Sequence, residues 1–151
     1  MENSIDNIIS KDLIKLDLNA KSKQEVIGWI VDAARGKDYL NDITEFKKSV
    51  MSREEGMPTA IGYSVAIPHG KDNSVQKPFV GFVRTNEEFV WTENYEEKVQ
   101  LVFLIGVPVE NENNIHLKFI SLLSKKLLDE EFRDSLLSSD DLNEVYDILN
   151  S

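Results

Sequence analysis

The sequence contains no cysteine and only two histidines among its 151 residues. The lack of cysteine excludes disulfide bonds, thiolate zinc sites and cysteine nucleophiles. The two histidines lie far apart and form no His-x-x-x-His pair, which argues against a dedicated transition-metal site. No G-x-x-x-x-G-K-[ST] loop and no G-x-G-x-x-G stretch occurs, so nucleotide binding has no support. We therefore expect neither a cofactor nor a metal.

Positive charge and long hydrophobic runs are also scarce. The 17 Lys and Arg residues against 27 Asp and Glu give a net charge of −10, and such a surface repels nucleic acid. The strongest apolar run, residues 99–109, is interrupted by Gln100, Gly106 and Pro108, and it falls short of the about 20 residues that span a bilayer. The polar residues 1–6 do not resemble a secretory signal. We expect a soluble, cytoplasmic protein without direct membrane insertion.

The strands are predicted from apolar patterning. The length fits one domain over residues 1–151, with residues 1–7 as a frayed end. The run at 99–107 is nearly all apolar, as is typical of a central strand covered on both faces. Other strands are predicted over residues 12–18, 60–68 and 79–84, with a short edge element at 89–91.

The helices are predicted from capping residues and apolar periodicity. Ser22 and Glu25 form a capping box in front of a helix that ends near Gly36, and Asp42 opens a second helix that runs to about Arg53. Strands flanked by helices predict an α/β domain built in layers, with a mixed sheet. The remaining helices are predicted over 112–128, 129–138 and 140–149, the last capped by Asp140 or Ser139.

His69 is the most informative residue for function. It follows an apolar run and lies between Pro68 and Gly70, so a strand that ends at Pro68 would hold its imidazole at the end of the sheet. With an unperturbed pKa of about 6.5, a histidine is largely neutral near pH 7 and can attack an electrophile or transfer a proton. A lone histidine at a strand end is, however, more often a partly buried side chain without such a role.

Two further residues could be brought to His69 by this fold. His116 lies in the first turns of the helix that follows the central strand, where the helix macrodipole favours a neutral imidazole. Arg53 ends the second predicted helix. If the three side chains meet, a neutral imidazole could act as the nucleophile while the other two donate to the oxygens of a transferring phosphoryl group, without a metal. The plainer interpretation is a helix-surface histidine and a solvated arginine at a helix end.

Several motifs occur in a defined order across residues 10–150. They are Arg53-Glu54, Pro58-Thr59 with Gly62, Ala66-Ile67-Pro68-His69, Lys77-Pro78-Phe79-Val80, Leu101–Pro108, His116-Leu117 and the region 127–132. This set of motifs resembles the IIA domain of the fructose–mannitol class of the bacterial phosphoenolpyruvate:sugar phosphotransferase system. One departure is Ser64, where that family commonly has glycine.

The resemblance implies a fold and a set of roles. The fold would be a mixed sheet of about five strands with helices on both faces, forming a single IIA domain. His69 would accept a phosphoryl group on Nε2 from the phosphocarrier protein HPr and pass it to a IIB component, with a membrane IIC component served indirectly. His116 would line the site, and Arg53 would stabilise the phosphate charge.

Two other functions stay open at this stage. The same family includes nitrogen-related IIA proteins, which are phosphorylated but regulate other proteins by binding them. A catalytically silent binding module is the third possibility, although His69, Arg53 and His116 together argue against it. We favour the sugar-transport function because Lys77-Pro78-Phe79 and the segment 89–91 look more like sugar-type IIA components. The identity of the sugar is not encoded in residues that handle phosphate.

Overall fold

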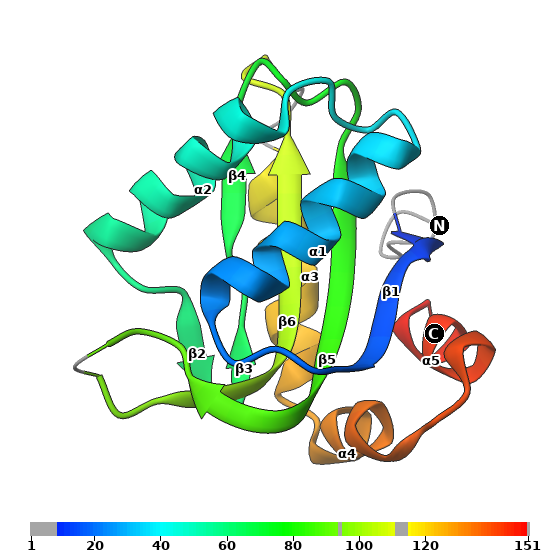
Figure 1. The fold of residues 1–151 in the computed structure, drawn as a ribbon. Helices are drawn as coiled ribbons and strands as arrows, with labels where there is room; N and C mark the ends of the chain where they lie inside the picture. The colour runs from blue at the N-terminus through cyan, green and yellow to red at the C-terminus, as the bar shows by residue number, and fades with distance from the viewer. Residues whose placement is uncertain (1–8, 94, 111–114, 151) are drawn as a thin grey trace.

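The computed structural model describes residues 9–93, 95–110 and 115–150, and for residues 115 and 116 it describes only the backbone. The expected frayed end at 1–7 lies outside these ranges. Within them the chain forms six strands and five helices (Figure 1). The strands are β1 (Ile9–Leu18), β2 (Ala60–Gly62), β3 (Val65–Ala66), β4 (His69–Lys71), β5 (Phe79–Val90) and β6 (Lys98–Val107). The helices are α1 (Lys23–Gly36), α2 (Ile43–Gly56), α3 (Ile115–Leu127), α4 (Glu130–Ser138) and α5 (Leu142–Leu149).

All six strands belong to one open sheet of mixed direction. Its order is β1-β5-β6-β3-β2, and β4 also pairs with β6. The strands β3 and β4 run parallel to β6, as β1 does to β5, whereas the β5–β6 and β2–β3 pairs are antiparallel. The predicted α/β class and mixed sheet are confirmed. The described strands number six rather than about five. The predicted strand at 60–68 is divided into β2 and β3, the strand β4 was not predicted, and the predicted elements at 79–84 and 89–91 merge into β5.

Helices cover both faces of the sheet, as predicted. On one face α1 and α2 pack against the sheet, and on the other face lie α3, α4 and α5 (Figure 1). Side chains of the central strand β6 alternate between the two layers: Val102 and Leu104 contact the first, Phe103 and Ile105 the second. All four are fully buried. The run 99–107 is nearly all apolar because its residues are buried between the two layers, apart from the partly buried Gln100.

The helix caps agree with the sequence patterns in part. The Ser22 hydroxyl accepts the Glu25 N–H, as a capping box requires. The Glu25 carboxylate, however, accepts the N–H of Lys21 at 2.9 Å rather than that of Ser22. The helix α5 is capped by Asp141, so the prediction of Asp140 or Ser139 was wrong by a residue or two. Asp140 instead binds Arg84.

The strand predicted over residues 60–68 was wrong in its middle. The chain makes a tight hairpin there, because Gly62, Tyr63 and Ser64 have φ angles of 91°, 59° and 66°. Two successive left-handed residues match a type I′ turn, which twists as the flanking strands do. The Ser64 position, where the resembling family carries glycine, therefore adopts a backbone conformation that glycine would adopt without strain.

The strand predicted over 79–84 is longer than expected, since β5 continues to Val90 and takes in most of the predicted edge element. Arg84 lies in its middle and is 2% exposed. Its guanidinium bonds both carboxylate oxygens of Asp17, one oxygen of Asp140, and the carbonyls of Leu136 and Ser139 near the end of α4. This buried arginine fixes the C-terminal helices to the sheet.

Candidate active site

His69 opens β4, so it does not lie at the end of the sheet as the sequence suggested. It pairs with Ile105 of β6, and β3 pairs in the same register, with Val65 opposite Leu101. Residues 65–71 thus run alongside β6 in a single register, and Pro68 interrupts the pairing without ending it. The Pro68 carbonyl still accepts the Ile105 N–H at 3.0 Å, which holds the chain in register through the interruption.

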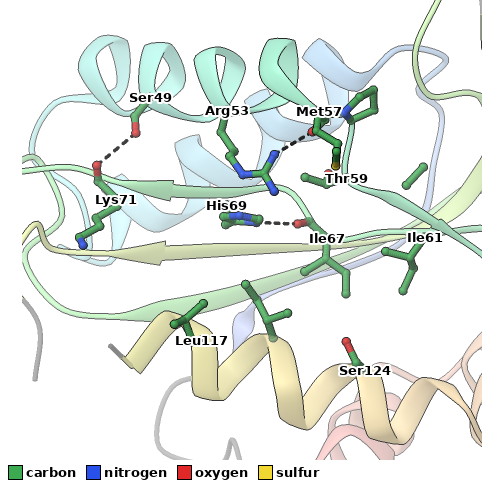
Figure 2. A pocket seen from close by; sticks show the side chains of 13 residues that line it. Ser49, Arg53, Met57, Thr59, Ile61, Ile67, His69, Lys71, Leu117 and Ser124 are labelled. Carbon is green, nitrogen blue, oxygen red and sulfur yellow. Dashed lines mark hydrogen bonds between the residues drawn. The ribbon is translucent and has the colours of Figure 1, made fainter. Parts of the chain in front are cut away.

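The backbone just before His69 binds its imidazole. Carbonyl groups along a strand point alternately to its two sides. The Pro68 carbonyl points towards β6, so the carbonyl of the preceding Ile67 points away from β6. The Ile67 oxygen lies 2.9 Å from His69 Nδ1 (Figure 2). Because a carbonyl can only accept, Nδ1 carries the proton, and the neutral ring therefore has an unprotonated Nε2.

The surroundings of His69 favour its neutral form. Partial burial is the largest effect and lowers the pKa of the imidazole below 6.5, because it penalises the charged ring. The nearby positive charge of Arg53 lowers this pKa further. The hydrogen bond to Ile67 and the negative charge of Glu54 act in the opposite direction but do not reverse the shift. His69 is thus held neutral at and somewhat below neutral pH.

His69 and Arg53 line the same pocket, which has a volume of about 700 Å³ and lies between α2 and α3 (Figure 2). Arg53 is in the last turn of α2, where its guanidinium donates to the Met57 carbonyl at 2.7 Å. An unprotonated ring nitrogen with a guanidinium in one pocket suits a small anionic electrophile. The other lining residues are Ser49, Met57, Pro58, Thr59, Ala60, Ile61, Ile67, Lys71, Leu117, Ile120 and Ser124.

Gly70 brings α2 close to β4 and so brings Arg53 to the pocket. A Cβ at this position would lie 2.8 Å from atoms of both Phe46 and Val50, which face the sheet from α2. Only glycine fits this approach without displacing the helix. A second connection is the Ser49 hydroxyl, which donates to the Lys71 carbonyl at 3.2 Å. The glycine after His69 is therefore explained by helix packing.

His116 is the second residue of α3, but its side chain lies outside the described residues. The same helix contributes Leu117, Ile120 and Ser124 to the pocket wall. The N-terminal turns of α3 thus border the site, as the sequence predicted for this segment. Whether the imidazole of His116 reaches His69 stays a prediction.

Sequence reasoning missed the role of Glu54, whose carboxylate is buried behind the pocket. Its side chain is 1% exposed, and it accepts from Lys23 Nζ at 2.9 Å, from Trp91 Nε1 at 2.9 Å, and from both the N–H and the hydroxyl of Thr59. The sequence does contain a signal for its burial. Glu54 follows Phe46 and Val50 at i+4 spacing, which places a carboxylate on the buried stripe of α2.

Exposed apolar side chains surround the mouth of the pocket. Met57, Ile61 and Leu117 line it and are 66%, 45% and 55% exposed. Tyr63 of the hairpin turn is also exposed but is not among the lining residues. Its ring lies under the guanidinium of Arg133, 4.1 Å from the ring centroid, because the hairpin turn directs it towards α4. Tyr63 therefore belongs to the neighbouring surface.

Neither a metal-binding cluster nor a membrane-spanning helix is present in the part of the chain that the structure describes. Within the described ranges, no three His, Asp or Glu side chains lie in an arrangement that could hold a metal ion. Of the helices described above, none is long and apolar enough to cross a membrane.

Comparison with known proteins places the chain in a family. The sequence model of "Phosphoenolpyruvate-dependent sugar phosphotransferase system, EIIA 2" matches residues 7–151. The chain is 34% identical over 146 residues to the PTS system fructose-specific EIIABC component of Bacillus subtilis, covering 97% of this chain and 23% of that protein. It is 30% identical over 145 residues to the PTS system fructose-specific EIIA component of Haloferax volcanii, covering 96% of this chain and 94% of that one.

Solved structures of IIA proteins have the same fold as this chain. The nitrogen regulatory protein IIA-Ntr of Neisseria meningitidis superposes with a TM-score of 0.86 at 29% identity, covering 97% of this chain and 99% of that one. The complex of enzyme IIA mannitol with phosphorylated enzyme IIB mannitol of Escherichia coli contains a chain that superposes with a TM-score of 0.80 at 25% identity, covering 94% and 98%. The chain thus spans about a quarter of the B. subtilis relative and nearly all of the H. volcanii one. It belongs to the EIIA 2 family of the phosphoenolpyruvate-dependent sugar phosphotransferase system.

Proposed function

We propose that this chain is a phosphocarrier, which accepts a phosphoryl group from phospho-HPr on His69 and passes it to a IIB component for coupled sugar uptake and phosphorylation. The observation that carries the proposal is the hydrogen bond from His69 Nδ1–H to the Ile67 carbonyl, which leaves Nε2 as the unprotonated nitrogen. Membership of the EIIA 2 family supplies the class of reaction. The site of action would be the cytoplasm, next to a membrane-bound IIC partner.

In the first transfer, the lone pair of His69 Nε2 attacks phosphorus. The bond between phosphorus and the donor atom of HPr breaks, and its electron pair returns to the donor. No proton has to leave His69, because the Nδ1 proton stays on its hydrogen bond to Ile67. The guanidinium of Arg53, in the same pocket, stabilises the charge on the phosphoryl oxygens. The resemblance implies that His116 lines the site and assists. The second transfer reverses these steps towards IIB.

Both partners must dock over His69 in turn. The exposed apolar side chains of Met57, Ile61 and Leu117 at the pocket mouth suit a small transient interface. The similar E. coli mannitol IIA was solved in a complex with phosphorylated IIB, which supports a IIB acceptor for this chain too. The net charge of −10 favours a basic rim on at least one partner, so the encounter rate should fall with added salt.

The direct test is phosphorylation with purified components. Phosphoenolpyruvate, enzyme I and HPr are mixed with the wild type or with His69→Ala, and intact masses are recorded at alkaline pH. We expect one acid-labile phosphoryl group on the wild type and none on the variant. No adduct with HPr from the same organism, or an adduct that survives in His69→Ala, would reject the proposal. Arg53→Ala and His116→Ala should each slow single-turnover transfer by about 10²-fold.

A regulatory function is the second candidate. The specific observation in its favour is the TM-score of 0.86 with the nitrogen regulatory IIA-Ntr of N. meningitidis. Transfer from the phosphorylated protein to a IIB component encoded beside it would support the transport function. A stable phosphoprotein that transfers to no such IIB and binds other proteins according to its phosphorylation state would support the regulatory one.

A further inference from the structure

Glu54 is the one buried acidic residue among those that the structure describes, and the phosphotransfer steps above leave it without a role. It pairs with Lys23, which is itself only 8% exposed and lies 5.1 Å from the centroid of the Trp91 ring. The Trp91 indole donates to the same oxygen, Oε1. A buried ion pair seldom stabilises a fold more than apolar packing of equal volume does. This network therefore calls for an explanation beyond stability.

One branch of the network leads to the imidazole of His69. Glu54 accepts from the Thr59 N–H at 3.3 Å and from the Thr59 hydroxyl. The carbonyl of Thr59 accepts the Ile67 N–H at 3.1 Å, and the carbonyl of the same Ile67 accepts the proton of His69 Nδ1 at 2.9 Å. Three consecutive links thus join the buried carboxylate to the ring that would carry the phosphoryl group.

These hydrogen bonds run through Thr59 and Ile67, two residues that lie outside the named strands and are therefore not held by regular sheet pairing. The strand β2 begins only at Ala60, and Ile67 falls between β3 and β4, outside the named strands. Both Thr59 and Ile67 are buried, at 6% and 3% exposed, so solvent cannot replace a lost partner. A loosened Thr59 would therefore free the Ile67 peptide, and with it the acceptor that selects the His69 tautomer.

We propose that Glu54 is a positioning residue for His69, which acts through Thr59 and the Ile67 carbonyl to keep the proton on Nδ1 and leave Nε2 free for the phosphoryl group. The proposal rests on the proposed function of His69 as the phosphoryl acceptor. The charge of Glu54 acts separately from these hydrogen bonds and in the opposite sense, since it raises the pKa of His69 while Arg53 lowers it. The Arg53-Glu54 pair thus places two opposed charges on one imidazole.

The test compares two variants that differ in whether the side chain at position 54 can still bond Thr59 and Trp91. Lys23→Met/Glu54→Gln keeps a polar group that can accept from the Thr59 N–H and from Trp91, whereas Lys23→Met/Glu54→Ala removes it. Replacing Lys23 in both avoids a buried ammonium without a counter-charge. Asp17→Asn is the control for general loosening, because it weakens the Arg84 network on the opposite side of the sheet, and asparagine tolerates the φ of 55° at this position.

The first readout is nitrogen-15 NMR of the His69 ring in the unphosphorylated protein. We expect the wild type, the Gln variant and the Asp17→Asn control to show the Nδ1–H tautomer, and the Ala variant to show a mixture of tautomers. Ring signals of a folded Ala variant identical to those of the wild type would overturn the proposal, as would an equal change in Asp17→Asn. If the Ala variant does not fold, Thr59→Val decides, since it removes one of the two bonds to Glu54; unchanged ring signals would then overturn the proposal.

The second readout is single-turnover transfer from phospho-HPr. The rate at saturating donor should fall about 10-fold or more in the Ala variant and recover in the Gln variant, as with other groups that orient a reacting side chain. The half-saturating donor concentration should not change, because Glu54 is 3% exposed and cannot touch a docked partner. A rise in that concentration with an unchanged rate would overturn the proposal. If the wild type is never phosphorylated, the proposed function fails, but the NMR result still decides the role of Glu54.

Discussion

Gly70→Ala should damage the site without touching any group that reacts. The added Cβ would lie 2.8 Å from Phe46 Cε1, 2.8 Å from Val50 Cγ2 and 3.1 Å from Phe46 Cζ, where ordinary carbon contacts are about 3.5–4.0 Å. Both neighbours are fully buried on α2, in an interior of the kind that is usually close-packed. The helix therefore has to move away from β4 by up to about 1 Å, at a typical overpacking cost of about 1–3 kcal/mol.

The displacement should appear in both stability and activity. For a domain of this size, each kcal/mol lowers the melting temperature by about 2–4 °C, so thermal unfolding should show a loss of about 2–12 °C. Because α2 carries Arg53, the same movement takes the guanidinium out of position. A misplacement near 1 Å can cost about 10²-fold in rate, which single-turnover phosphorylation of His69 would detect.

Gly36→Ala is the matched control, since a Cβ there meets nothing within 4 Å and α1 carries no residue of the pocket. Alanine at a helix position is favoured over glycine by about 1 kcal/mol, so this variant should be as active as the wild type and slightly more stable. Gly70→Ala with unchanged melting would refute the packing argument. A lower melting temperature of Gly70→Ala with an unchanged phosphoryl-transfer rate would refute the proposed link between the packing of α2 and the position of Arg53.

Three further predictions follow from the geometry. Since the pKa of His69 is below 6.5, the rate of its phosphorylation plotted against pH should fall on the acid side with a midpoint below 6.5. Arg53→Gln should move this midpoint to higher pH, because it removes a positive charge that lowers the pKa of His69. A midpoint that stays fixed would contradict the electrostatic effect. Ser64→Gly should stabilise the chain by about 0.5–1 kcal/mol in urea unfolding, because it relieves a φ of 66° at the loss of one exposed bond to Glu88, and a lower stability would show that this bond matters more. Arg84→Met should cost about 3 kcal/mol or more by leaving buried α4 carbonyls without a donor, and an unfolding curve like that of the wild type would disprove its anchoring role.

Features that depend on local patterning could be predicted from the sequence. The nearly continuous apolar run of β6 and the capping residues Ser22 and Asp42 signal a central strand and two helix starts, and the structure has them there. The hairpin at 62–64 could not be predicted in the same way. Tyr63 and Ser64 rarely adopt positive φ, and they do so here because pairing with β6 on one side and with β2 on the other requires a turn.

The same distinction applies to the site: some of its residues are marked by local sequence pattern, and others are recognised only by their tertiary contacts. His69 was recognisable because its neighbours Pro68 and Gly70 are unusual, and the structure gives the reason for the glycine, which admits α2 to β4. Glu54 carries no such local mark except its i+4 spacing from Val50. Its partners come from positions 31, 5 and 37 residues away along the chain, and only the folded sheet brings them together. A residue that acts through others is defined by its contacts, so its role has to be found in the structure.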